Sequence, residues 1–144
     1  MRLPTPRPGL VIRYGFLWSH EADNGADEAA KDRPCAIIVA TQRGNDDDLR
    51  VIVAPITHRP PADTTASIEI SAGVCRQLGL DGQEHWLRVD ELNRFSWPGY
   101  DLKPIPGRGT IEYGLLPQGL FEELRTRVIQ RQRSRQGRRP IDRD

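Results

Sequence analysis

The sequence predicts a mainly β fold of the α+β type, in which a small β-barrel or strongly bent sheet carries helices on its surface. Several short segments rich in β-branched and aromatic residues are separated by turn signals, as expected for closely connected strands. One segment near the C-terminus instead has apolar residues at helical spacing. Many short strands and one closing helix are typical of such a barrel.

The length and the charge pattern indicate one domain followed by a basic segment. A chain of 144 residues fits one domain comfortably, and we expect residues 1–130 to form it and residues 131–144 to form a flexible basic tail. The formal net charge is only +1, but residues 125–143 hold eight arginines and one acid. This basic end suits contact with phosphates or with an acidic protein, and it is equally compatible with a solvated, frayed terminus.

The composition argues against a metal site, a disulfide framework and a membrane span. Cys35 and Cys75 are the only cysteines and have no cluster of metal-ligand residues around them, so we expect two reduced core residues. The aspartates at 46–48 lack the glycine and glutamate of a calcium loop, and we expect no cofactor. The sequence has no apolar signal region and no run of membrane-spanning length, so we expect a cytoplasmic protein.

Two strands define the candidate site. Residues 35–40 contain no polar side chain and suit a strand covered on both faces, and the proline that follows Arg33 favours an extended conformation at its start. Residues 49–58 form a β-branched strand that ends in polar groups, and the turn signal at 44–46 predicts that the two strands pair as a hairpin. Arg33 and Thr57 are then expected at the same end of the sheet.

The other elements are predicted from local patterns. We expect strands at 9–18, 67–70, 85–92 and 108–113, a short helix at 72–77 between a serine cap and a glycine stop, and a helix that begins at Pro117. The apolar face of this last helix consists of Leu116, Leu120, Phe121, Leu124 and Val128. Residues 19–32 are predicted to form a long loop, which is either functional or a mobile hairpin tip.

Four short stretches, in this order, resemble the MazF/PemK toxin family. They are the opening strand at 9–12, the loop that ends in Arg33-Pro34, the segment Pro55-Ile56-Thr57 after the second strand, and the segment Val89-Asp90-Glu91-Leu92-Asn93. The resemblance covers roughly residues 8–130. It implies an SH3-like barrel with a short helix and a C-terminal helix, assembled as a homodimer.

The resemblance also implies a function. Members of this family are toxins of type II toxin-antitoxin systems, and they act as metal-independent endoribonucleases that cut single-stranded RNA at specific sequences. Single strands suit such enzymes because their bases can be splayed out and read. A cognate antitoxin protein would hold the toxin inactive, and any contact with DNA would be made only through the antitoxin complex.

Four residues are candidates for catalysis. Arg33 and Thr57 match the family's catalytic arginine and threonine, since a planar guanidinium fits phosphate oxygens and a hydroxyl donates a further hydrogen bond. Glu28 matches an acidic position that some members place near the site, where a carboxylate either acts as base or only orients Arg33. His58 departs from the family pattern and is a further candidate acid or base, because histidine side chains change charge near neutral pH.

Four further residues are predicted to contact RNA, and they are Trp18, Arg59, Arg94 and Trp97. Arg94 suits a phosphate contact. Trp97 and its neighbour Phe95 either stack on unpaired bases or close the end of the barrel. The loop before Arg33 is longer than in typical members, which leaves the path of the substrate open.

Two non-catalytic functions remain as alternatives. CcdB-type toxins share the barrel and inhibit DNA gyrase through a C-terminal helix and its final residues, whereas this chain ends in an arginine-rich segment. A catalytically silent relative would bind RNA or a protein partner through residues 125–143.

For the homodimer, we expect a twofold interface in which the same patch meets itself. The strand at 49–54 or the helix at 116–128 is predicted to supply this patch. Arg125 and Ile129 would form the exposed flank of the helix, where an arginine stem can cover apolar surface while its charge stays hydrated.

Overall fold

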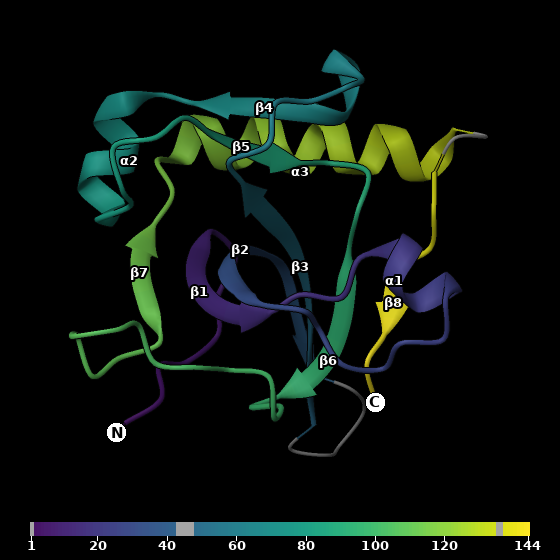
Figure 1. Cartoon of the computed structure of the whole chain (residues 1–144), viewed down its shortest axis with the longest axis horizontal. Coiled ribbons are helices and arrows are strands. Elements are labelled where there is room, and N and C mark those ends of the chain that lie inside the picture. Colours follow the sequence, from purple (N-terminus) through teal and green to yellow (C-terminus); the bar gives the residue numbers. More distant parts are fainter. Residues whose placement is uncertain (1, 43–47, 135–136) are drawn as a thin grey trace.

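A curled sheet of eight strands forms the body of the protein in the computed structural model, which describes residues 2–42, 48–134 and 137–144. The strands are β1 (Leu10–Gly15), β2 (Asp32–Gln42), β3 (Leu49–Thr57), β4 (Ser67–Ile70), β5 (His85–Arg88), β6 (Asn93–Trp97), β7 (Glu112–Leu115) and β8 (Ile141–Asp142). The helices are α1 (Ser19–Asp23), α2 (Ala72–Leu78) and α3 (Gln118–Arg133), with a 3₁₀ turn at Thr64–Ala66. The predicted mainly β fold with a short helix and a C-terminal helix is therefore confirmed at this level (Figure 1).

Strand β3 lies at the centre of the sheet and pairs along both of its edges. β2 pairs antiparallel with one edge, which confirms the predicted hairpin. On the other edge, β6 pairs with the stretch from Leu49 to Val53, and β5 pairs with Ile56 and Thr57. The strand predicted at 49–54 therefore has no free edge, so it cannot extend the sheet into a second copy of the chain as a dimer interface.

The order of the sheet is β4-β5-β3-β2-β1-β7, and β6 branches from β3 to meet β8. All pairs are antiparallel except β6 with β8. The predicted turn at Gly44–Asp46 between β2 and β3 lies outside the described residues.

Side chains alternate between the two faces of the sheet and form two cores. The outer core lies between the sheet and the helices α2 and α3, and it includes Ala36, Ile38, Ala54, Ile56, Leu78, Leu124 and Val128. The inner core lies on the opposite face, among β1, β2, β3 and β6, and it includes Ile12, Tyr14, Cys35, Ile37, Val51, Val53 and Phe95. Trp97 packs against the inner core, so Phe95 and Trp97 help to close this end of the fold. Both cysteines are free and buried, as predicted.

Strand β2 has one residue more than the opposing part of β3. The register passes directly from Ile37–Val53 to Val39–Ile52, so Ile38 occupies a β-bulge. Because of the extra residue, Ile38 and Val39 both pack on the outer core. A bulge of this kind bends a strand and increases its twist, which helps the sheet to curl.

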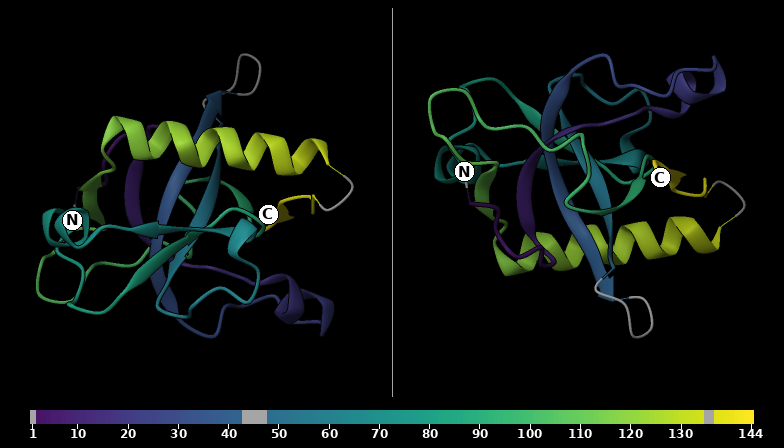
Figure 2. Two further views of the ribbon diagram at one scale, coloured as in Figure 1. Left: turned by 90° about the horizontal axis from the view of Figure 1, so that it is seen from above. Right: turned by 90° about the horizontal axis from the view of Figure 1, so that it is seen from below.

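The two longer helices follow the sequence signals closely. Ser71 caps α2, because its hydroxyl accepts a hydrogen bond from the Val74 N–H at 3.3 Å, and Gly79 ends the helix with a φ of 69°. α3 begins directly after Pro117 and buries Leu124 and Val128. Figure 2 shows α3 lying across β1, β2 and β3. None of the helices in the described part of the chain is long and apolar enough to cross a membrane.

Several element boundaries differ from the sequence predictions. The strand predicted at 9–18 is β1, which covers only Leu10–Gly15. The strand predicted at 108–113 is β7 at Glu112–Leu115, and Arg108 lies in the turn before it. The predicted loop at 19–32 contains the short helix α1. The strand predicted at 85–92 ends at Arg88, and a new strand, β6, begins at Asn93.

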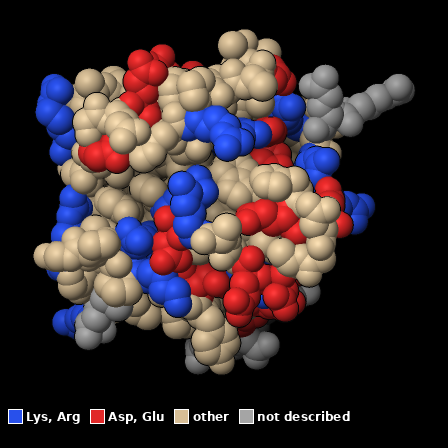
Figure 3. All heavy atoms as spheres, viewed as in Figure 1, with Lys and Arg blue, Asp and Glu red and all other residues tan. Residues whose placement is uncertain are grey.

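Charged side chains of both signs are interleaved over the face seen in Figure 1. Figure 3 shows basic and acidic atoms side by side in the centre of this face, with acidic atoms gathered at its lower right. This pattern fits the near-zero net charge of +1, because no single sign dominates the surface in view.

The basic segment after residue 130 is not the free tail that the sequence predicted. α3 continues to Arg133, and β8 then pairs with β6. The Arg143 N–H donates to the Arg94 carbonyl at 2.9 Å, and Asp144 accepts a hydrogen bond from the Ser96 N–H at 2.6 Å. The end of the chain is thereby fixed along the edge of β6 (Figure 1).

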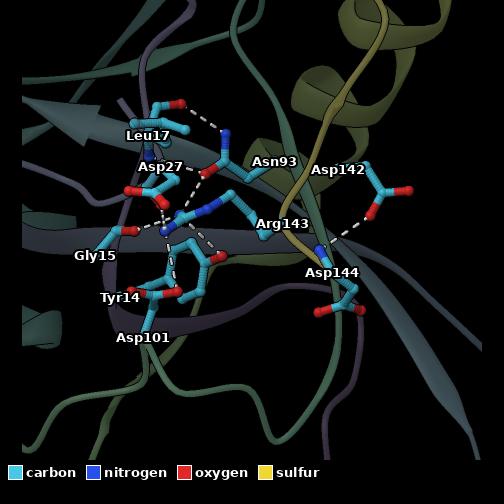
Figure 4. Close-up of polar contacts among 9 residues, drawn as sticks. All are labelled: Tyr14, Gly15, Leu17, Asp27, Asn93, Asp101, Asp142, Arg143 and Asp144. Atoms are coloured by element: carbon cyan, nitrogen blue, oxygen red, sulfur yellow. Dashed lines mark hydrogen bonds and ion pairs between the residues drawn. The ribbon is translucent and has the colours of Figure 1, made fainter. Parts of the chain in front are cut away.

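Arg143 carries its guanidinium into the middle of the fold, where its side chain is only 4% exposed. It donates to the Asn93 Oδ1 at 3.1 Å and to the Tyr14 hydroxyl at 3.2 Å, and it pairs with Asp101 at 3.0 Å (Figure 4). The fully buried Asn93 also exchanges two hydrogen bonds with the backbone of Leu17, at 2.7 and 2.9 Å. Buried polar groups need hydrogen-bond partners, and here the partners come from different elements. The network therefore joins β8, β6 and the end of β1.

We expect Arg143→Ala to lower the free energy of unfolding by about 3 kcal/mol, because it leaves Asn93 and Asp101 without a charged partner. Arg139→Ala is the matched control, since Arg139 is exposed in the same segment and its loss should change the value by less than about 0.5 kcal/mol. Urea unfolding of the three proteins measures both effects. Equal losses in the two variants would mean that the buried contacts of Arg143 add no stability beyond that of an exposed arginine.

A second prediction concerns alkaline pH. Burial raises the pKa of Tyr14, Tyr113 and Cys35, because desolvation disfavours their anions. A raised pKa in the folded state means that only the unfolded chain loses these protons, so stability falls as the pH rises above the ordinary values of 9.0 for the thiol and 10.0 for the phenols. In urea unfolding, the free energy of unfolding of Tyr14→Phe should decline less steeply with pH than that of the parent. The difference should be about 1 kcal/mol per pH unit above the ordinary phenol pKa. Tyr100 is 97% exposed, so the stability of the control Tyr100→Phe should decline like that of the parent.

Candidate functional site

A groove of about 1140 Å³ opens at the end of the sheet where β2 begins and β3 ends. Five of the predicted site residues line it, and they are Trp18, Arg33, Thr57, His58 and Arg59. The walls also carry charged residues of both signs, among them Arg13, Lys31, Arg88, Arg108, Glu21, Asp32, Asp81, Asp90 and Glu91.

The hairpin register brings Arg33 and Thr57 together. The pairing of β2 with β3 reaches Cys35 opposite Pro55, and Arg33 and Thr57 each lie two residues further along. Because alternate residues of a strand share a face, both lie on the face that carries the inner core. The prediction that these two residues lie at the same end of the sheet is confirmed.

The Arg33 guanidinium rests on an aromatic ring instead of an acid. Its central carbon lies 4.9 Å from the centre of the Trp18 ring, and no hydrogen bond or ion pair links it to another described residue. Its Nε is buried without a hydrogen-bond partner. Burial lowers the pKa of Arg33, and this effect is opposed by the nearby Glu21. A guanidinium remains charged at any ordinary pH, so the groove holds a cation that is not neutralised by direct contact.

Arg88, the second arginine at Trp18, is in a different state. Its guanidinium carbon lies 5.2 Å from the centre of the same ring. Two hydrogen bonds of 2.7 Å bind it to the Asp90 carboxylate, and they raise the pKa of Arg88. The charge of Arg88 is thus compensated within the protein, whereas that of Arg33 is available to a ligand.

The Thr57 hydroxyl already has a structural partner. Its oxygen accepts a hydrogen bond from the Arg59 N–H at 3.2 Å, which stabilises the turn after β3. Thr57 is 8% exposed and lies at the wall of the groove. A hydroxyl that accepts one hydrogen bond can still donate its own hydrogen, so Thr57 combines a turn-forming role with a free donor.

His58 belongs to a cluster with Asp81 and His85. Each histidine Nε2 lies 3.1 Å from a different oxygen of the Asp81 carboxylate, and the two rings lie 4.6 Å apart between their centres. Desolvation acts to raise the pKa of Asp81, but the Gln83 N–H and the two histidines outweigh it and hold the pKa below its ordinary value. Asp81 is therefore an ionised carboxylate that orients His58 at the mouth of the groove.

Three of the predicted site residues do not line the groove. Glu28 is exposed in the loop before β2. Arg94 lies on β6 and pairs with Asp142 at 2.9 Å, and Trp97 packs against the inner core. The structure thus brings together Trp18, Arg33, Thr57, His58 and Arg59 and separates the other three from them.

Four groove residues that shape the site were not among the predicted site residues, and they are Glu21, Asp81, His85 and Arg88. The carboxylate that affects Arg33 is Glu21, not the predicted Glu28. The signal for His85 was its place at the start of the strand that pairs with the end of β3, but only the register reveals that pairing. Spacing along the sequence does not indicate the cluster of His58, Asp81 and His85, because its members lie in separate segments that only the fold brings together.

Comparison with known proteins adds no family assignment. No protein-family model matches the chain, and no curated protein matches it at a significant level.

Proposed function

We propose that the protein is a metal-independent endoribonuclease of the toxin type, with an SH3-like barrel of the MazF/PemK kind, and that it cleaves single-stranded RNA in the groove. The observation that supports this most directly is Arg33, a half-buried guanidinium held on Trp18 with no acid bound to it among the described residues. An uncompensated cation at the wall of a groove is suited to bind a phosphate. The family resemblance of the segments around Arg33 and Thr57 supports the same conclusion.

Arg33 and Thr57 would bind the phosphate at which the RNA is cut. The ring of Trp18 covers one face of the guanidinium, while its edge N–H groups remain free to donate to two phosphate oxygens. The Thr57 hydroxyl would donate a further hydrogen bond. These donors stabilise the negative charge that develops on phosphorus in the transition state.

His58 is the best candidate for the base. It is 46% exposed at the groove and oriented by Asp81, whose negative charge would stabilise the imidazolium. His58 would take the proton of the 2′-hydroxyl as its oxygen attacks phosphorus. The bond from phosphorus to the 5′-oxygen then breaks, a water molecule gives this oxygen a proton, and His58 returns its own proton to the solvent. The products are a 2′,3′-cyclic phosphate and a free 5′-hydroxyl. Glu28 is not needed in this scheme.

The bound strand would be guided by the rest of the groove. Arg59 is exposed next to Thr57 and can contact a neighbouring phosphate. Trp18 serves mainly to position Arg33, because two guanidinium groups already contact its ring. Arg94 and Trp97 would meet RNA only if the strand extended beyond the groove to β6. In the cell, the proposed activity would be exerted on cytoplasmic mRNA and restrained by an antitoxin protein.

The arrangement of the C-terminal segment argues against the two alternatives. A CcdB-type inhibitor needs its last helix and final residues for its target, whereas residues 141–144 here are bound to β6 and to the inner core. An RNA-binding arginine tail would need free arginines, and part of this segment is already engaged: Arg143 is buried, Arg131 pairs with Asp63 and Arg138 pairs with Asp23.

The test is cleavage of a long single-stranded RNA by the purified protein in the presence of EDTA. We expect discrete fragments with cyclic phosphate and 5′-hydroxyl ends. Arg33→Ala should reduce the rate at least a hundredfold, since it removes the main donor to the phosphate. His58→Ala should reduce it by about a hundredfold or more through loss of the base. Thr57→Val keeps the shape of the side chain and should reduce the cleavage rate less than Arg33→Ala or His58→Ala does.

Two variants make this experiment specific. Arg33→Lys keeps the charge but loses the planar fork, so only part of the activity should remain. Arg76→Ala removes an exposed arginine of α2 outside the groove and should cleave like the parent. Cleavage that survives in Arg33→Ala would rule out this site. Binding of RNA without any cleavage would instead favour the non-catalytic relative.

We also propose a homodimer, in which the groove of one subunit adjoins that of the other. Light scattering should then give about twice the chain mass of 16.3 kDa. Ile129 is half-buried, lies outside both cores and marks the flank of α3, so Ile129→Glu should yield monomers. Gln130→Glu adds the same charge at the next, exposed position and should leave the dimer intact. A monomeric parent at all concentrations would contradict the proposal.

A further inference from the structure

The cluster of His58, Asp81 and His85 contains the donor atoms of a metal site. The two imidazole nitrogens and a carboxylate oxygen all lie within 4.8 Å of one another. We infer that these three residues bind one divalent transition-metal ion of the zinc type. This site is separate from Arg33, and its occupation does not depend on the proposed nuclease activity.

The backbone supplies two of the ligands as neighbours across the sheet. β3 ends with Thr57 paired to Trp86, so the antiparallel register places His58 opposite His85. Side chains opposite each other in such a pair start about 5 Å apart, so two histidines there can direct their rings at the same point. The rings are tilted by 56° rather than stacked, and both Nε2 atoms point to Asp81.

Asp81 is held in place by its own loop. Its Oδ1 accepts a hydrogen bond from the Gln83 N–H at 3.0 Å, which fixes the carboxylate at the start of the turn into β5. In the described chain its ion-pair partners are the two histidines and no arginine or lysine. A carboxylate without an arginine or lysine partner is suited to bind a cation, because the ion would not have to displace a permanently charged side chain.

The ligand atoms have to move closer together to reach tetrahedral coordination. Bonds of about 2.0 to 2.1 Å to nitrogen and oxygen place tetrahedral ligands about 3.3 Å apart. Each histidine Nε2 lies 3.1 Å from a different Asp81 oxygen, and one ligand atom from each of the three residues lies within 4.8 Å of the other two, so the three side chains have to converge on one point. His58 can make this adjustment, because its side chain is 46% exposed, whereas the side chain of His85 is only 4% exposed and is fixed by its neighbours.

The ligand set determines the class of ion. Two imidazoles and one carboxylate favour Zn²⁺ and its neighbours over Ca²⁺ or Mg²⁺, which prefer oxygen ligands. Asp81 and His58 lie at the open side of the groove, so water can take the fourth position. If His58 is the base of the proposed nuclease, a bound ion on its Nε2 would leave the ring proton on Nδ1, so the ring could not accept a proton from the RNA and cleavage would be inhibited. Only this consequence rests on the proposed function.

The test measures metal binding without RNA. Protein freed of metal by a chelator is titrated with ZnCl₂ in a calorimeter and with CoCl₂ in a spectrometer. We expect one equivalent to bind, and we expect the strong visible absorption of tetrahedral Co²⁺. His58→Ala and Asp81→Asn should each weaken binding at least tenfold, because each removes one of three ligands. Circular dichroism shows whether each variant is folded. If one of the two variants does not fold, the other alone is enough for the test.

His20→Ala is the matched control, because His20 is exposed in the wall of the same groove but is not part of the cluster. It should bind metal like the parent. Absence of binding in the parent, or equal binding in the parent and His58→Ala, would overturn the inference. Neither result would affect the cleavage test in EDTA, and loss of cleavage would not affect the titration. The two proposals can therefore fail separately.

Discussion

The pairing of β3 along both edges is the constraint on which the rest of the structure depends. β2 occupies one edge, while β6 and β5 divide the other between them. The chain must therefore cross from β5 to β6 within the four residues 89–92. This short crossing buries Asn93 at the start of β6 and directs its amide at the backbone of Leu17. It also leaves the end of β3 between Arg33 on one side and His85 on the other.

The groove shows how one aromatic ring can support two cations in different electrostatic states. Arg88 lies near Trp18 and is neutralised by Asp90, so its contribution is mainly structural. Arg33 lies near the same ring and has no such partner among the residues that the structure describes. Contact with a ring stabilises a guanidinium by about 1 kcal/mol without taking up its N–H groups. A carboxylate in place of the ring would hold Arg33 more firmly but would compete with an anionic ligand. An aromatic ring is therefore a better partner than a carboxylate for an arginine that must be ordered and still able to bind an anion.

Local patterns predicted much of the fold, because they depend on neighbouring residues. The apolar run at 35–40, the serine cap at Ser71 and the apolar stripe of α3 all lie where the sequence placed them. The shared end of Arg33 and Thr57 followed from one short hairpin. What could not be predicted depends on contacts between distant segments. Nothing near Arg143 distinguishes it from the other arginines of the tail, and only the burial of Asn93 and Tyr14 gives it a role. The cluster around Asp81 likewise depends on the register of β5.

The bulge at Ile38 has a consequence for how this chain can vary. A strand normally cannot gain or lose one residue, because every side chain beyond the change would move to the opposite face. Here β2 already holds one residue that β3 does not match. Removal of Ile38 would leave Ile37 opposite Val53 and Val39 opposite Ile52, with each side chain still on its present face. Position 38 is thus a place where related chains can differ in length inside a core strand, at the cost of one apolar side chain and some curvature, while Arg33 and the groove keep their register.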